Sequence, residues 1–170
     1  MLKPPYTAAA VANFFIEKNV AESRDLSHLK IQKLLYYAQG WHMANYGLLL
    51  FNEPIEAWRH GPVVRSIYNA LSGSGDRQIF NKISVVYDQG YGQPDIPEED
   101  VQTRDFLEEF WKVYGPLHAF ALTNATHDPG TPWDTVVKLN RGCLGYGEII
   151  PNSLIHEHFK AQKVASEVSG

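Results

Sequence analysis

One short segment of the chain combines an aromatic ring, two basic side chains and a rigid turn. Its sequence is Trp58-Arg59-His60-Gly61-Pro62. A tryptophan ring beside an arginine can stack on a partner group, and the guanidinium can bind a carboxylate through two hydrogen bonds. The segment is therefore a candidate binding site. A structural role fits the sequence equally well, with Trp58 in the core and Arg59 paired with an internal acid such as Glu56.

The pair His127-Asp128 is suited to acid–base chemistry. It falls in a predicted loop between helices, where functional residues are often found. With Arg59 and a nearby tyrosine it would form a hydrolytic or transfer site, provided that all lay within about 3–4 Å of a common point. The run Asp128-Pro129-Gly130 is also a typical turn, in which His127 simply ends the preceding helix. The sequence favours this second interpretation.

Patterns for metal binding and nucleophilic catalysis are weak. His156 and His158 are two residues apart on a predicted helix, so they point to different sides and cannot chelate one ion together. The sequence has no HExxH motif and no paired cysteines. Cys143 has no acid or base near it, and no serine lies in a G-x-S-x-G sequence. We therefore expect no metal, no cofactor and no catalytic residue.

The composition is that of a globular protein, with 44% hydrophobic and 20% charged residues. The length of 170 residues predicts one domain, with a core over residues 7–160 and a frayed tail over 161–170. A formal net charge of −4 disfavours nucleic-acid binding, which needs a positive surface. One cysteine fits a reducing compartment. Because no secretory signal and no apolar run of roughly 20 residues are present, we expect a cytoplasmic protein without a membrane span.

Two helices near the start of the chain are the clearest structural predictions. The first should run from Thr7 to Asn19, with Thr7 as N-cap and an apolar face at helical spacing. The second should run from Ser27 to Tyr46, with Gly47 as its stop. Its buried face should carry Ile31, Leu34, Leu35, Ala38, Trp41 and Asn45. On a neighbouring face lie Lys30, Lys33 and Tyr37, and from spacing alone the lysines are expected to be solvated.

The rest of the chain predicts short helices and a few extended pieces. Together with the first two helices this gives a mainly α fold, a compact bundle of about six or seven helices with a small two- or three-stranded β element. Extended pieces are expected over 48–58, 79–87 and 148–150, and an exposed loop over 88–97. Helices are expected from Gly61-Pro62 to residue 72, over 98–114 and 117–126, from 131 to about 141, and from Asn152 or Ser153 towards Val164.

Three blocks of the sequence resemble the Panacea-domain family of phage-associated and antitoxin-type bacterial proteins. The first runs from Leu29 to Trp41, the second from Ile55 to Val63 with Tyr68 following, and the third comprises Thr126-His127 and Pro132-Trp133. The blocks occur in the family's order, and the resemblance covers residues 7–159.

The resemblance implies a mostly helical domain with a small sheet and no catalytic activity or cofactor. It implies an antitoxin that neutralises a cognate toxin, encoded by an adjacent gene on a mobile element, by direct contact. An alternative is an adaptor that delivers its partner to an ATP-dependent protease, and the hydrolase or transferase built on His127 and Arg59 is a further one. The partner-binding or family-motif residues are Lys30, Gln32, Lys33, Tyr37, Trp58, Arg59, Gly61, Pro62, Tyr68, His127, Pro132 and Trp133.

Overall fold

The computed structural model describes residues 3–145 and 147–169, and this part of the chain is mainly α-helical. The helices are α1 (Ala8–Glu22), α2 (His28–Tyr46), α3 (Arg65–Leu71), α4 (Val101–Tyr114), α5 (Ala119–Thr126), α6 (Pro132–Leu139) and α7 (Asn152–Ser169). The strands are β1 (Ile55–Trp58), β2 (Gly61–Val63), β3 (Val85–Tyr87), β4 (Gly90–Gly92) and β5 (Ile149–Ile150). The predicted fold class is confirmed.

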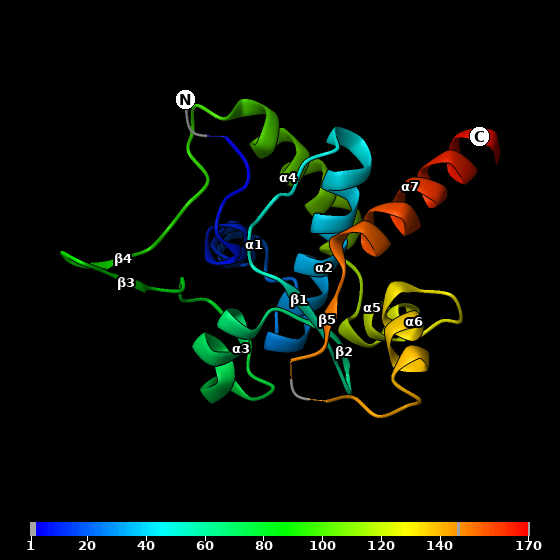
Figure 1. The fold of residues 1–170 in the computed structure, drawn as a ribbon. Helices are drawn as coiled ribbons and strands as arrows, with labels where there is room; N and C mark the ends of the chain where they lie inside the picture. The colour runs from blue at the N-terminus through cyan, green and yellow to red at the C-terminus, as the bar shows by residue number, and fades with distance from the viewer. Residues whose placement is uncertain (1–2, 146, 170) are drawn as a thin grey trace.

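Helix α2 lies at the centre of the fold, and α1, α3, α4, α5, α7 and β2 all pack against it (Figure 1). Its ends follow the sequence prediction. The Ser27 side chain accepts a hydrogen bond from the Lys30 amide, and Gly47 closes the helix in the left-handed conformation. Thr7 caps α1 in the same way by accepting from the Ala10 amide, although α1 continues to Glu22, three residues beyond the prediction.

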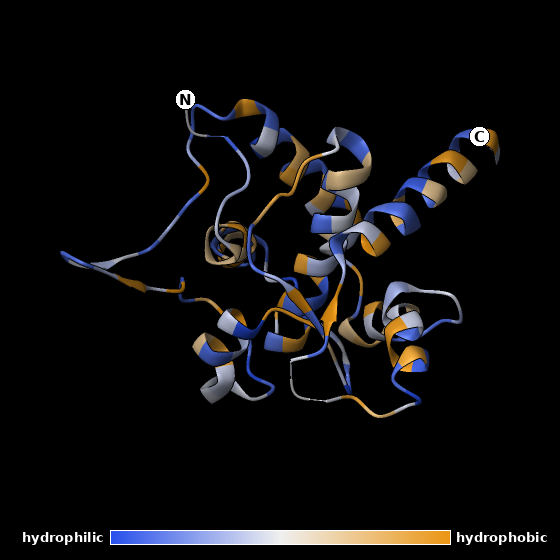
Figure 2. Cartoon of the chain, viewed as in Figure 1, coloured by the Kyte–Doolittle hydropathy of each residue, from blue (hydrophilic) through white to orange (hydrophobic). Residues whose placement is uncertain are grey.

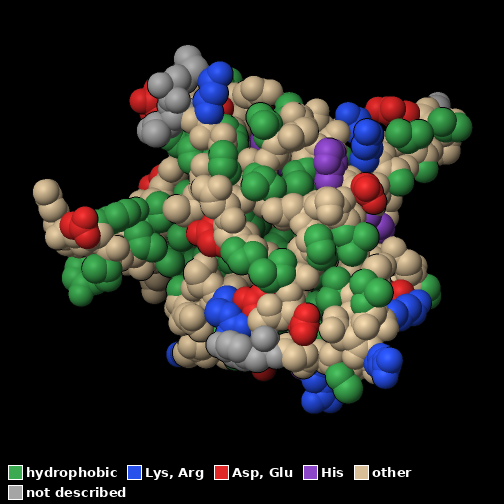
Figure 3. Space-filling model, in the orientation of Figure 1, with side chains coloured by type: hydrophobic (Ala, Val, Ile, Leu, Met, Phe, Trp, Pro, Cys, Tyr) green, Lys and Arg blue, Asp and Glu red, His purple; other side chains and the backbone are tan. Residues whose placement is uncertain are grey.

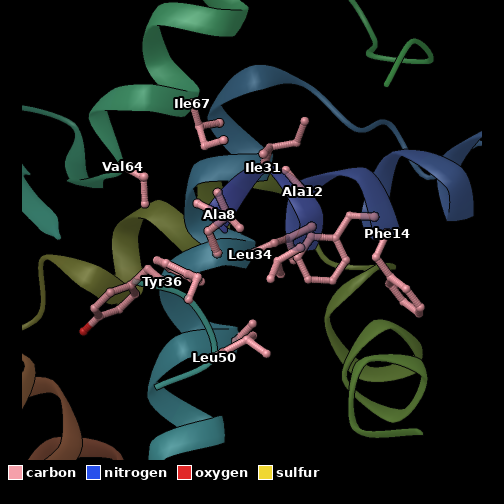
Figure 4. Close-up of a cluster of buried hydrophobic side chains, with 14 of the residues drawn as sticks. Ala8, Ala12, Phe14, Ile31, Leu34, Tyr36, Leu50, Val64 and Ile67 are labelled. Carbon is pink, nitrogen blue, oxygen red and sulfur yellow. The ribbon is translucent and has the colours of Figure 1, made fainter. Parts of the chain in front are cut away.

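The hydrophobic core forms where α1 and α2 meet the segments that cross them. Figure 4 shows Phe14 of α1 and Leu34 of α2 in this cluster, together with Leu50 and Ile67 from later elements. Aromatic rings extend the core towards α4, where the Phe15 and Phe110 ring centroids are 5.6 Å apart. In Figure 2 the β5 strand appears as a hydrophobic piece at the middle of the fold, whereas α7 alternates between hydrophobic and hydrophilic residues.

A three-stranded antiparallel sheet with the order β2-β1-β5 lies beside α2. Strands β1 and β2 form a hairpin in which Trp58 pairs with Gly61 and Glu56 with Val63. The two residues between the strands make the turn. This hairpin corrects one expectation: Gly61-Pro62 belongs to a strand, and the helix begins only at Arg65.

A long segment between α3 and α4 carries the hairpin of β3 and β4, which extends away from the rest of the protein (Figure 1). Hydrophobic side chains cover much of it in the space-filling view of Figure 3, and Tyr91 is 82% exposed. The segment is anchored by buried Asn13, whose side chain donates to the Ile83 and Pro94 carbonyls and accepts from the Ile83 amide. The strand pairing at Gly90–Gly92 replaces part of the predicted loop.

Two further expectations about helices are wrong. The sequence predicts this helix from residue 98, but α4 begins at Val101, because Asp100 is its N-cap, and Val101 is 60% exposed. The last helix was expected to run towards Val164, but α7 continues to Ser169; Gly170 lies outside the described residues. Helix α7 packs against α2, where the Phe159 ring lies against Gly40.

Candidate functional site

The two lysines of α2 that the sequence predicted to be solvated are buried. Lys30 is 2% exposed and Lys33 is 0% exposed. The Lys30 ammonium donates to the carbonyl oxygens of Arg24 and Gly115, both at 2.6 Å. It thereby ties the segment before α2 to the end of α4. Burial lowers the pKa of Lys30. Lys30 is thus a structural tie inside the fold.

Lys33 lies beneath the hairpin turn and makes a different set of contacts. Its ammonium donates to the Pro62 carbonyl at 3.0 Å, and burial lowers its pKa from 10.5 to about 7. The backbone above it has to approach closely: a Cβ at Gly61 would lie 2.9 Å from the Lys33 ammonium and 2.9 Å from the Thr126 hydroxyl. Gly61 also has a φ of +104°, a conformation that glycine adopts without strain. The Gly-Pro pair of the motif therefore fits the hairpin onto Lys33.

Two more residues of the motif on α2 bind backbone groups of neighbouring segments. The Gln32 side chain accepts from the Val64 amide at 2.8 Å and donates to the Val64 carbonyl at 3.2 Å. The Tyr37 hydroxyl donates to the Leu122 carbonyl at 3.1 Å. These bonds hold the exit of β2 and the middle of α5 against α2. Burial raises the pKa of Tyr37, so its hydroxyl stays a donor at neutral pH.

The third sequence block closes over the hairpin from the other side. The Trp133 indole donates to the Trp58 carbonyl at 2.7 Å, and its ring centroid lies 4.0 Å from that of His127. Pro132 is buried at the first position of α6, behind its N-cap Thr131. The chain thus brings all three blocks together around the β1–β2 hairpin.

A surface pocket of about 380 Å³ opens next to this network. The Trp58 and Tyr68 rings lie 4.7 Å apart at its wall, and the His28 ring lies 5.3 Å from Tyr68. Tyr68 and Arg59 are exposed, and Trp58 is half-buried. The pocket is lined by His28, Leu29, Gln32, Lys33, Trp58, Arg59, His60, Val63, Tyr68, Ser72, Gly75 and Asp76.

The internal ion pair expected for Arg59 belongs to another arginine. Glu56 is 4% exposed and accepts two hydrogen bonds from Arg65, at the start of α3. The Arg65 guanidinium also lies 5.3 Å from the centroid of the Trp58 ring, which fixes that ring. Within the described residues, no carboxylate pairs with the Arg59 guanidinium. The Arg59 side chain is therefore available at the rim of the pocket.

His127, the central residue of the acid–base alternative, uses its ring for contacts with the backbone. The His127 ring nitrogens face backbone carbonyls, Nδ1 that of Thr123 at 2.8 Å and Nε2 that of Arg59 at 3.3 Å. It is thus the backbone of Arg59 that meets His127, while Asp128 is exposed. This geometry fits the interpretation of His127 as the residue that ends α5.

No group of three or more His, Cys, Asp or Glu side chains in 3–145 and 147–169 is arranged to hold a metal ion. No helix in the same part of the chain is long and apolar enough to cross a membrane.

Two residues of this region were not among the sequence predictions: His28 lines the pocket, and Arg65 braces the Trp58 ring at its wall. His28 lies one turn before Gln32 and contacts it, with 3.3 Å between His28 Nε2 and Gln32 Nε2, so helical spacing was a usable signal. Arg65 pairs with Glu56 only because the hairpin folds back. No local pattern in the sequence indicates that pairing.

Comparison with known proteins gives two matches. Residues 31–134 match the family described as "Antitoxin SocA-like, Panacea domain". The chain is also 33% identical over 163 residues to the protein named Antitoxin SocA of Caulobacter vibrioides (strain NA1000 / CB15N), which covers 95% of this chain and 86% of that protein. No solved structure matches the chain. The matches confirm the resemblance carried by the three sequence blocks: the chain belongs to the Panacea-domain family of SocA-like antitoxins.

Proposed function

We propose that this protein is an antitoxin that neutralises a cognate toxin by direct contact in the cytoplasm, without catalysing a reaction. The toxin is proposed to be the product of an adjacent gene. The name of the similar protein, Antitoxin SocA, supports the antitoxin role. The alternative of a proteolytic adaptor differs only in what happens to the partner after binding.

The pocket beside the β1–β2 hairpin is the single observation that carries the proposal of direct contact. Its accessible groups are Trp58, Tyr68 and Arg59, the residue types that most often dominate the binding energy of protein interfaces. The rings are preorganised, because Arg65 and Tyr68 both pack on Trp58. Rigid anchors lose little side-chain entropy when a partner binds.

The remaining motif residues support that pocket from beneath. Gln32, Lys33 and Trp133 each hydrogen-bond the backbone at or next to the β1–β2 hairpin. We therefore assign Gln32 and Trp133 to positioning the turn, and we assign contact with the toxin to the pocket and its exposed rim. Stability measurements separate the two groups, because a rim residue can be changed without unfolding the protein.

The test is growth of a bacterial host that expresses the adjacent gene, with and without this protein. Rescue of growth is expected from the wild type, and loss of rescue from Trp58→Ala and Arg59→Glu, with both variants folded. Val168→Ala, at an 83% exposed position near the end of α7, is the control and should rescue fully. Toxicity without rescue by the wild type would contradict the proposal.

The half-life of the partner distinguishes neutralisation from delivery to a protease. A direct neutraliser leaves the half-life of the toxin unchanged or lengthens it, whereas an adaptor shortens it. A pulse-chase of the tagged toxin, with and without this protein, measures the difference. A half-life that this protein shortens would favour the adaptor.

A further inference from the structure

The pocket beside the hairpin is a positive site on a protein whose formal net charge is −4. Arg59 is a cationic lining residue, Lys33 is cationic below its lowered pKa of about 7, and Asp76 is the one acidic residue among the described lining. The nearby Glu56 is already neutralised by Arg65. The remaining charge favours an anionic group in the pocket.

The contacts of Lys33 are those of a buried binding group rather than of a residue that the core requires. It is 0% exposed and its ammonium has one hydrogen bond to the described residues, to the Pro62 carbonyl. Burying an ammonium with so few partners is costly, since each lost water contact has to be replaced. An anion that enters the pocket would supply the missing counter-charge. Lys30, three residues earlier, has two carbonyl acceptors and is not among the described residues that line this pocket.

The positive charge of Lys33 acts on His28, a second residue that lines the pocket. Burial lowers the pKa of His28, another lining residue, and the positive charge of Lys33 lowers it further. An anion bound there would favour the protonated forms of both side chains. The apolar walls are supplied by the Trp58 and Tyr68 rings, whose centroids are 4.7 Å apart. The site thus has cationic groups beside flat apolar surfaces.

We propose that this pocket binds an aspartate or glutamate side chain of the cognate toxin, with its carboxylate beside Lys33 and Arg59 and its methylene groups against Trp58 and Tyr68. The proposal rests on the proposed function. It adds the chemistry by which the partner is recognised. It also gives a role to a lysine whose burial the fold alone does not require.

The first arm of the test measures the affinity for the purified product of the adjacent gene. Lys33→Met and Arg59→Glu are each expected to weaken binding by about tenfold or more. Lys160→Glu, an exposed position on α7, makes the same change of charge as Arg59→Glu and should bind within about twofold of the wild type. The melting temperature of each variant is measured in parallel. Wild-type affinity in both pocket variants would overturn the proposal.

The second arm needs no toxin. The capped residue N-acetyl-aspartate amide is titrated into the full chain while the indole N–H signal of Trp58 is followed by NMR, with the signal assigned from Trp58→Phe. Saturable shifts are expected with the aspartate probe, and not with the asparagine analogue or in Lys33→Met. Absence of shifts at all probe concentrations would overturn the proposal, as would shifts from inorganic phosphate alone.

The two arms separate the failure of this proposal from the failure of the proposed function. A wild type that does not bind the adjacent gene product, yet responds to the aspartate probe, contradicts the proposed toxin and supports the pocket chemistry. A wild type that binds the toxin with no effect of Lys33→Met or Arg59→Glu supports the proposed function and overturns the carboxylate site.

Discussion

Lys30 and Lys33 lie one turn apart on α2 and are both buried, yet within the described residues Lys30 donates to two backbone carbonyls and Lys33 to one. The two lysines of the α2 motif therefore have different roles. Lys30 joins segments that are 85 residues apart in sequence, from α2 to Gly115. Lys33 supports the hairpin and lines the pocket.

Replacing Lys30 with methionine is expected to destabilise the fold. The change leaves the Arg24 and Gly115 carbonyls without the ammonium donor, and hydrogen bonds from charged groups contribute more than neutral ones. We expect the free energy of unfolding to fall by about 2–3 kcal/mol, measured by urea denaturation at neutral pH. Lys160→Met is the exposed control and should leave the midpoint unchanged. Equal midpoints for the two variants would contradict the structural role of Lys30.

Lys33 should make stability depend on pH. Burial lowers its pKa from 10.5 to about 7 in the folded protein, and the unfolded chain keeps the ordinary value. Between these pKa values the unfolded state binds more protons, so the Lys33 contribution to stability rises with pH by up to about 1.4 kcal/mol per unit. Below the folded pKa both states are protonated, and the penalty is constant.

Lys33→Met removes this dependence. The unfolding free energy of the variant minus that of the wild type is therefore expected to be larger at pH 7 than at about pH 9.5. Urea denaturation of both proteins at the two pH values gives the difference. A difference that stays constant would mean that Lys33 titrates normally in the folded state.

Much of the helical framework was predictable from local signals. Thr7, Ser27 and Thr131 each accept the N-cap hydrogen bond that their position in the sequence indicated. The burial of Lys30 and Lys33 was not predictable. Gly115 and Pro62, whose carbonyls accept from them, are distant in sequence, and helical spacing indicates only which residues share a face of the helix.

The β1–β2 hairpin shows why the position of the site was only partly predictable. Gly61-Pro62 has the composition of a helix start, and a proline at the first helical position is common. In the fold, Gly61 instead adopts a positive φ and pairs with Trp58. Long-range pairing with β1 and the close approach of Lys33 decide the outcome. The motif therefore indicated which residues meet, but not the strand geometry in which they meet.

Gly40 is expected to tolerate no side chain. A Cβ at this position would overlap the ring of Phe159, a residue of α7 that is fully buried against α2. We expect Gly40→Ala to lower the free energy of unfolding by about 2 kcal/mol through overpacking. Gly73→Ala is the matched control, since no atom lies within 4 Å of its added Cβ. Chemical denaturation of both variants checks the prediction. Equal stability would mean that α7 shifts away from α2 and makes room for the added methyl group.

Gln32 should contribute to stability through the two hydrogen bonds that it makes to Val64. Gln32→Leu keeps a similar size but leaves the buried Val64 amide without its acceptor, while the Val64 carbonyl still accepts from the Tyr68 amide; the change should cost about 2 kcal/mol. Gln162→Leu makes the same replacement on the exposed face of α7 and is expected to have little effect. Urea midpoints compare the two variants. A stable Gln32→Leu protein would show that water replaces the lost bonds.

Trp58 should matter more for binding than for folding. Its ring is half-buried between Tyr68 and Arg65, so truncation to alanine should cost less than the roughly 3–5 kcal/mol typical of a tryptophan in a core. If the pocket contacts the toxin, Trp58→Ala should weaken binding by about tenfold or more. Trp58→Phe keeps a ring against Tyr68 and should give an intermediate affinity. Calorimetric titration with the toxin and thermal unfolding measure the two effects on the same samples. Full affinity in folded Trp58→Ala would place the interface elsewhere, whereas unfolding of this variant would assign Trp58 to the core.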